Sequence, residues 1–159
     1  NDVSGISELL EDHEKGTTMN IKKLILLPIS LVFSAAGCAG IGPNATYYMG
    51  TTSANYNPTY NTYDVKLNNH IIGGAIGSMN TSAVKIGLQD VTWKDAKTGE
   101  LHKSKNQVIL NKNDVKDKKY LVVHLYPDDT IEIITSLNWP VPTEKGLKWR
   151  EKIKNNGAK

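Results

Sequence analysis

Residues 120–135 read Tyr120-Leu121-Val122-Val123-His124-Leu125-Tyr126-Pro127-Asp128-Asp129-Thr130-Ile131-Glu132-Ile133-Ile134-Thr135. Both ends of this stretch are rich in β-branched, aromatic and aliphatic residues, which favour strands. Between them Pro127-Asp128-Asp129 is a turn sequence, because proline presets one backbone angle and aspartate side chains bond to nearby main-chain amides. The stretch therefore predicts a β-hairpin. Strand periodicity places His124 on one face with Tyr120, Val122 and Tyr126.

Shorter segments of β character precede this hairpin. Several of them alternate apolar and polar residues, the period of a half-buried strand. Asn68-Asn69 is a turn signal, Gly73-Gly74 marks a bulge or a close approach, and Gly99 suits a positive-φ hairpin position. The segments are residues 63–67, 70–76, 82–88, 90–96, 101–103 and 107–110.

The end of the chain has the pattern of a short helix. Thr143 is a suitable cap for a helix through Lys154, and Trp149 and Ile153 lie four residues apart on one face. Together these segments predict a mainly β fold, a small antiparallel β-sandwich or barrel-like domain with a short C-terminal helix.

A charged and then apolar segment precedes the predicted domain. Lys22 and Lys23 follow Met19, and residues 24–36 carry no charge, which is the order of a secretory signal. As a helix this run rises only about 20 Å, less than the roughly 30 Å hydrocarbon core of a bilayer, so it is not expected to remain as a transmembrane helix.

The apolar run ends in Ala35-Ala36-Gly37-Cys38, which resembles the lipobox of bacterial lipoproteins. We expect cleavage before Cys38, followed by a covalent diacylglycerol and N-acyl chain on that cysteine. The alternative is a soluble secreted protein that is cut at the same stretch. Ala39 follows in place of the aspartate that tends to retain enterobacterial lipoproteins at the inner membrane. The resemblance therefore implies the periplasmic face of the outer membrane, with surface display as the alternative.

The chain of 159 residues divides into four predicted parts. Residues 1–18 precede Met19, and we expect an untranslated leader read in frame or a genuine acidic extension. Residues 19–37 are the predicted lipoprotein signal peptide, residues 38–61 a lipidated tether, and residues 62–159 a β-rich periplasmic domain. The tether has too many tyrosines for a pure spacer, so part of it is expected to pack on the domain or to form a first strand.

The residue composition limits the chemistry of the domain. Cys38 is the only cysteine, so an intramolecular disulfide and a thiolate metal cluster are both excluded. From Cys38 onward 16 basic and 11 acidic side chains give a net charge of +5. They are scattered, which favours a solvated surface over an attraction to an acidic partner or to anionic lipid.

Catalytic and metal-binding signatures are weak. No G-x-S-x-G elbow occurs. His70, His102 and His124 lack the spacing that would direct two of them at one metal, and we predict that His124 is a hydrogen-bonded structural residue. Asp128-Asp129 is favoured as a turn over a weak calcium site. We therefore predict no catalytic residue, no metal, no cofactor besides the lipid on Cys38, and no nucleic-acid partner.

Two stretches of the domain carry a resemblance to a known family. They are residues 120–128 with Ile131-Glu132, and the set Tyr56-Asn57, Asp64-Val65, Asn68-Asn69, Gly73-Gly74 and Val91-Thr92-Trp93. These stretches resemble the small proteobacterial lipoproteins of unknown biochemical activity, and the resemblance covers most of residues 54–136. Members often lie beside genes for type VI secretion phospholipase effectors, which implies immunity lipoproteins that protect the periplasm from a sister cell's toxin.

Three functions follow from these observations. The first is an immunity protein that binds and inhibits a secreted lipase effector without catalysis. The second is a structural or envelope-assembly lipoprotein without a toxin partner, and the third is a hydrolase that uses His124 or His70. For the first, Tyr56, Tyr60 and Trp139 are the predicted partner-binding residues, because large amphipathic rings give contact area at a small cost in entropy. Packing in the core or on the tether is the alternative for each of them.

Overall fold

The computed structural model describes residues 46–157. The expectations for residues 1–18, for the signal peptide at 19–37 and for the lipid on Cys38 lie outside these residues. The strands are β1 Thr46–Asn55, β2 Thr62–Leu67, β3 His70–Ile71, β4 Asn80–Lys85, β5 Gly87–Gln89, β6 Val91–Asp95, β7 Leu101–Lys103, β8 Val108–Leu110, β9 Tyr120–Leu125 and β10 Ile131–Ser136, and the helices are α2 Lys112–Val115 and α3 Glu144–Gly157.

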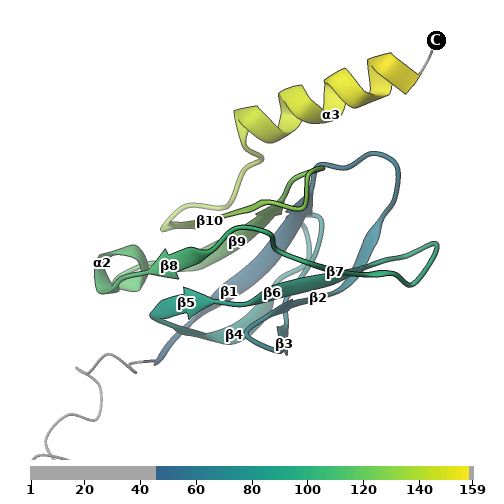
Figure 1. The fold of residues 1–159 in the computed structure, drawn as a ribbon. Coiled ribbons are helices and arrows are strands. Elements are labelled where there is room, and N and C mark those ends of the chain that lie inside the picture. The colour runs from purple at the N-terminus through teal and green to yellow at the C-terminus, as the bar shows by residue number, and fades with distance from the viewer. Residues whose placement is uncertain (1–45, 158–159) are drawn as a thin grey trace, which may run out of the picture. The chain divides into compact units, whose positions relative to one another are not determined.

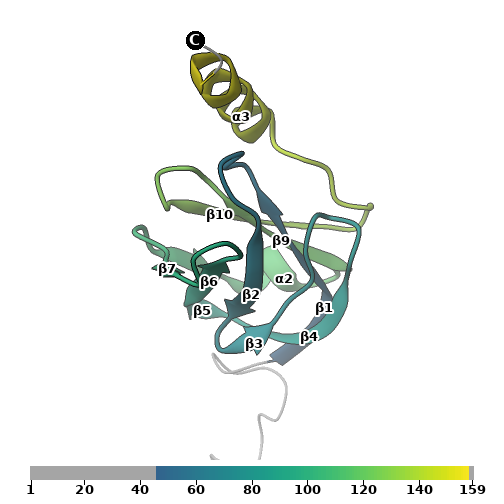
Figure 2. The same ribbon diagram turned by 90° about the vertical axis from the view of Figure 1, so that its right-hand side faces the viewer.

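Most strands belong to two four-stranded sheets, which share one core (Figures 1 and 2). The first has the order β10-β9-β1-β4 and the second β3-β2-β6-β7, while β5 and β8 pair as a separate two-stranded ribbon. Among the described strands every pair is antiparallel except β1 with β9. The predicted small, mainly β domain with a C-terminal helix is confirmed. It is a sandwich, and residues 46–157 form no closed barrel.

Alternation along β9 explains the position of the core. Leu121, Val123 and Leu125 project between the sheets and belong to one buried cluster with Trp93 of the second sheet. Burial of each such side chain contributes about 1.5–3 kcal/mol. The intervening residues of β9 face away from the second sheet, and His124 is one of them. This outer face of the first sheet is where α3 attaches.

Several predicted elements are confirmed. The hairpin of β9 and β10 forms, and its turn is held by bonds from the main-chain amide and hydroxyl of Thr130 to the Asp128 carboxylate. Asn68 and Asn69 both adopt positive φ in the turn before β3, and Gly99 does so between β6 and β7. These turns were predictable because their chemistry is local.

Two predicted strands are shorter than expected. The strand predicted at residues 70–76 ends at Ile71, because the chain then folds back so closely that a Cβ on Gly73 would lie 1.8 Å from the Ser78 carbonyl oxygen. Gly73-Gly74 is therefore a close approach, one of the two predicted possibilities. The strand predicted at residues 82–88 is divided into β4 and β5 before Gly87, whose φ is +100°.

The tether predicted for residues 38–61 is wrong in its length, because β1 occupies residues 46–55 inside the first sheet. This strand has no apolar alternation, since its buried centre is polar. The Thr51 hydroxyl bonds to the Ser82 hydroxyl at 2.8 Å, and the Ser53 hydroxyl donates to the Gly73 carbonyl at 2.8 Å. These long-range partners satisfy polar groups that would otherwise destabilise a buried strand. The alternative expectation, a first strand in this stretch, is confirmed.

The last part of the described chain leaves the sheet. Residues 137–143, which we name the strap, connect β10 to α3 (Figure 1). Thr143 caps α3 as predicted, because its hydroxyl oxygen accepts a bond from the Gly146 amide. Within residues 46–157 neither helix has the length and apolar composition to cross a bilayer.

Candidate functional site

A cleft of about 550 Å³ opens where β1 ends and α3 begins. Three segments line it. They are residues 54–65, which contain the loop from β1 to β2, the turn at residues 72–76, and the start of α3 with Pro142. We name this the α3 cleft. Concave surfaces of this size are the usual sites for ligands and for inserted side chains.

The walls of the α3 cleft mix apolar and polar groups. Tyr63 of β2 and Leu147 of α3 are large apolar side chains that remain exposed at the cleft. Ile72 is buried beside them, and Tyr60 is partly buried. The peptide groups and asparagines of the loop from β1 to β2 add polar atoms. Such a surface suits an apolar side chain that arrives with its own hydrogen-bonding backbone.

The backbone around the cleft is strained. Asp64, Ala75 and Ile76 line the cleft and have φ values of 50°, 56° and 58°. The left-handed region is unfavourable for residues with a Cβ, most of all for a β-branched residue such as Ile76. Such conformations persist where the surrounding structure holds them, and they are often found at binding sites.

Two charged residues line the cleft, Asp64 and Arg150. Asp64 lies 3.0 Å from the Lys94 ammonium and 3.5 Å from that of Lys66. The bond from Lys94 is the main cause that holds the pKa of the Asp64 carboxyl below its ordinary value. Arg150 lines the opposite wall and forms no ion pair with any of residues 46–157. The Asp64 carboxylate is thus neutralised by lysines outside the cleft, whereas the Arg150 guanidinium is the cleft cation without an ion pair among residues 46–157.

A buried chain of hydrogen bonds ties the start of α3 to the first sheet. The Thr143 amide donates to the Tyr56 hydroxyl oxygen at 2.8 Å, and that hydroxyl is 2.8 Å from Nδ1 of His124. The Tyr56 oxygen accepts from Thr143, and its proton can go to Nδ1 when the imidazole is neutral and carries its proton on Nε2.

A second tyrosine supports the same helix start. The Tyr126 hydroxyl lies 3.1 Å from the Thr143 hydroxyl and donates to the Glu132 carboxylate at 3.2 Å. The Trp149 ring stacks on Tyr126 with centroids 6.0 Å apart, and the Lys145 ammonium lies 4.3 Å from the centroid of the Tyr126 ring. Stacking and cation–π contacts of this kind favour one fixed position of the helix.

Gly146 allows α3 to approach the sheet closely. A Cβ at this position would lie 2.5 to 2.6 Å from carbons of the Tyr56 ring. Only glycine permits this contact between a helix backbone and an aromatic face. We call the set Tyr56, His124, Tyr126, Thr143 and Gly146 the α3 latch, because it fixes one wall of the cleft.

His124 is 1 % exposed. Its burial lowers its pKa to about 4, an effect that the Glu132 carboxylate partly opposes. The ring also stacks on Tyr56, with centroids 5.8 Å apart. The predicted hydrogen-bonded histidine is confirmed, and its bonded partner is a tyrosine of the cleft.

A second histidine is held against the core. Nδ1 of His102 lies 3.2 Å from both carboxylate oxygens of Asp129, and the ring stacks on Tyr60 and on Trp93. The Trp93 indole N–H donates to the Tyr60 hydroxyl oxygen at 3.1 Å, and burial raises the pKa of Tyr60. This cluster connects β7 to the turn before β10. Of its members only Tyr60 lines the α3 cleft.

The predicted partner-binding residues have different surroundings. Tyr56 is 2 % exposed: it lines the α3 cleft, but its ring packs beneath α3 and serves the latch, which is the packing alternative. Tyr60 lines the α3 cleft but also holds Trp93. Trp139 is 57 % exposed on the strap, in edge contact with Tyr120. Cys38 lies outside the described residues.

Sequence reasoning missed the cleft residues Ile72, Ile76, Leu147 and Arg150. Their side chains come from segments more than 70 residues apart. The one available signal was Gly73-Gly74, which marked a close approach of backbone. Among the described residues no three carboxylate or imidazole side chains gather as a metal site.

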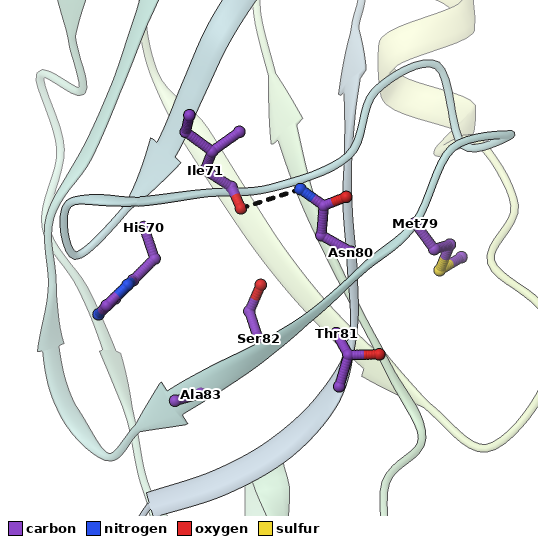
Figure 3. A pocket seen from close by; sticks show the side chains of 7 residues that line it. All are labelled: His70, Ile71, Met79, Asn80, Thr81, Ser82 and Ala83. Carbon is purple, nitrogen blue, oxygen red and sulfur yellow. Dashed lines mark hydrogen bonds between the residues drawn. The ribbon is translucent and has the colours of Figure 1, made fainter.

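A second hollow, of about 470 Å³, lies between β3 and β4. Figure 3 shows its walls, which the Asn80 side chain bridges by a bond of 3.1 Å to the Ile71 carbonyl. The hollow is more open than the α3 cleft, and its lining exposes little apolar surface. The α3 cleft is therefore the stronger candidate.

No protein-family model, curated protein or solved structure matches this chain.

Proposed function

We propose that this chain is a lipoprotein anchored to the periplasmic face of the outer membrane, and that it is an immunity protein. In this role it binds and inhibits a secreted lipase effector. The resemblance of this chain to the small proteobacterial lipoproteins suggests that the effector is a phospholipase. The observation that carries the proposal is the α3 cleft, a concave surface of mixed apolar and polar lining with a wall fixed by the α3 latch. Arg150, which forms no ion pair with any of residues 46–157, favours a carboxylate on the inserted segment of the partner.

The anchoring part of the proposal rests on Ala35-Ala36-Gly37-Cys38 and on the short link behind it. Eight peptide units separate Cys38 from Thr46, and an extended chain of that length spans at most about 29 Å. Strand β1 then runs for 10 residues toward the cleft. The start of β1 would be held near the bilayer, and the cleft would be carried into the periplasm.

The surroundings of the histidines support binding over hydrolysis. His124 is committed to Tyr56 in the α3 latch, and His70 is exposed on the two-residue strand β3. A hydrolytic histidine needs a nucleophile or a bound water in reach and a group that orients it. His124 faces a tyrosine that already bonds to the helix start, so we assign it to the structure of the cleft.

A competition between sister cells tests the proposal. The gene is deleted in a strain with an active type VI secretion system, and the deletion strain is mixed with its parent. We expect survival of the deletion strain to fall, and the plasmid-borne full-length chain to restore it. A parent whose secretion system is inactivated is the control and should leave the deletion strain unharmed. Equal survival of the deletion strain against both parents would overturn the proposal.

A structural or envelope-assembly role is the second candidate. It is favoured by apolar side chains that are exposed away from the cleft, namely Leu88 and Ile109 on the β5–β8 ribbon. In that role the deletion would sensitise cells to detergent in the absence of any attacker. The competition distinguishes the two roles, because only the immunity role depends on the attacker's secretion system.

A further inference from the structure

We infer that the β5–β8 ribbon is a membrane-docking surface that rests on the bilayer holding the Cys38 lipid. This inference depends on the lipid anchoring proposed above, but it does not depend on the identity of the effector. It assigns a lipid surface, with anionic headgroups, as the partner of a second face of the domain.

The ribbon presents an apolar pair to solvent. Leu88 and Ile109 are direct cross-strand partners, so their side chains stand on the same face. Leu88 is 59 % exposed and Ile109 is 68 % exposed. The opposite face of the ribbon carries Leu110, which is buried in the core. The ribbon is therefore fixed from behind, and its outward aliphatic pair has no cover among residues 46–157.

The ribbon lies at the end of the sandwich from which the anchor would extend. Thr46, the first residue of β1, is the register partner of Lys85 in β4, and β5 begins two residues after Lys85. Figure 1 shows the start of β1, the ribbon and α2 at this end, with the hairpin of β6 and β7 at the other. A link of eight peptide units from Cys38 holds this end within about 29 Å of the lipid.

The segment next to the ribbon is basic. Residues 112–119 contain four lysines and two aspartates, and Lys112, Lys116 and Lys119 are exposed. The two aspartates are Asp114, which caps the helix start by bonding to the Asn111 amide, and Asp117. Basic residues beside exposed aliphatic ones are the combination that binds the interface of an anionic bilayer.

The bilayer is favoured over another occupant because of the anchor. A lipid on Cys38 would keep the ribbon at the membrane at all times, whereas a protein partner or a second copy would have to find it by diffusion. A weak apolar and basic surface becomes effective when its target is tethered so close to it.

Site-specific fluorescence tests the docking. In the lipidated protein the Cys38 sulfur is a thioether, so Ile109→Cys introduces the single free thiol for an environment-sensitive fluorophore. The full-length protein is reconstituted in vesicles of phosphatidylethanolamine and phosphatidylglycerol, with and without spin-labelled lipids that quench fluorescence. We expect several-fold stronger quenching at position 109 than at position 101 in Leu101→Cys, an equally exposed aliphatic position on β7. Leu88→Cys should behave as Ile109→Cys does.

The outcomes separate docking from anchoring. Protein that floats with the vesicles but shows equal quenching at positions 109 and 101 would overturn the docking and leave the anchoring intact. The Cys38→Ser control is expected not to float with the vesicles. If the protein that retains Cys38 also does not float, the anchoring is overturned and the docking with it. Shielding at position 109 without quenching by the lipid labels would indicate a second copy in place of the bilayer, and this too would overturn the docking.

Discussion

His124 is the residue whose charge state is most altered by the fold. Burial lowers its pKa to about 4 from the ordinary value of 6.5. Between these two values the unfolded chain binds a proton that the folded chain does not, so stability is lost as the pH falls through this window. We expect the free energy of unfolding to fall by roughly 3 kcal/mol from this residue on acidification from neutral pH to about pH 4. Urea unfolding over this range measures it.

Two substitutions identify the titrating group. His124→Asn keeps a hydrogen-bond acceptor for Tyr56 but does not titrate, so the variant should lose this part of the pH dependence even if it is less stable at neutral pH. His70→Asn, at an exposed position on β3, should keep the wild-type pH dependence. An unchanged pH dependence in His124→Asn would show that another group is responsible.

Polar residues also explain why some positions of the fold were predictable and others were not. The turns at Asn68-Asn69 and at Gly99 could be predicted from the sequence, because the required backbone conformation is local to those residues. Thr51 and Ser53 look like loop residues in the sequence. They are buried only because Ser82 and the Gly73 carbonyl, 31 and 20 residues away, satisfy their hydroxyls. No local pattern contains that information.

At the scale of the element, the attachment of α3 depends on one missing side chain. Gly146→Ala would normally strengthen a helix by about 1 kcal/mol. Here the added methyl would meet the Tyr56 ring at 2.5 Å, so we expect a net destabilisation of about 1–3 kcal/mol, the range for overpacked cores. Chemical denaturation measures the stability, and faster tryptic cleavage within α3 would report that the helix has moved away from the sheet.

Gly157→Ala is the matched control in the same helix. A Cβ at Gly157 meets no atom within 4 Å, so this variant should be at least as stable as the wild type and should retain wild-type cleavage. If Gly146→Ala proved as stable and as resistant to trypsin as Gly157→Ala, the close contact of α3 with Tyr56 would be refuted.

Strands and helices were predicted correctly where the residue pattern and the turn or cap that ends it are neighbours in the sequence. The hairpin of β9 and β10 and the capped helix α3 are of this kind. Strand β1 was missed as the partner of β9, because a parallel pair joins Gly50 to Tyr120 across 70 residues of chain. The α3 cleft could not be predicted for the same reason. It forms only when β1, the turn at residues 72–76 and α3 have assembled.

At the scale of the whole molecule, the sandwich has two different ends. The ribbon end carries the exposed pair Leu88 and Ile109, and the other end carries the α3 cleft with Arg150. In the two proposals the first end meets the bilayer and the second meets the effector. This division of roles predicts that the two ends tolerate different substitutions.

The most direct test of the central claim uses variants of the α3 cleft in the competition between sister cells. The deletion strain carries either the wild-type chain or the double variant Leu147→Asp with Arg150→Glu, and is challenged by its parent. The control combines Leu101→Asp with Lys152→Glu, which makes the same changes of charge at exposed positions that do not line the cleft.

The amount of each variant in the membrane fraction is measured beside survival, so that a loss of protein is not mistaken for a loss of binding. We predict that the cleft variant leaves at least about tenfold fewer survivors than the wild type, as expected when central interface residues are lost, while the control protects fully. Full protection by the cleft variant at wild-type abundance would contradict the account.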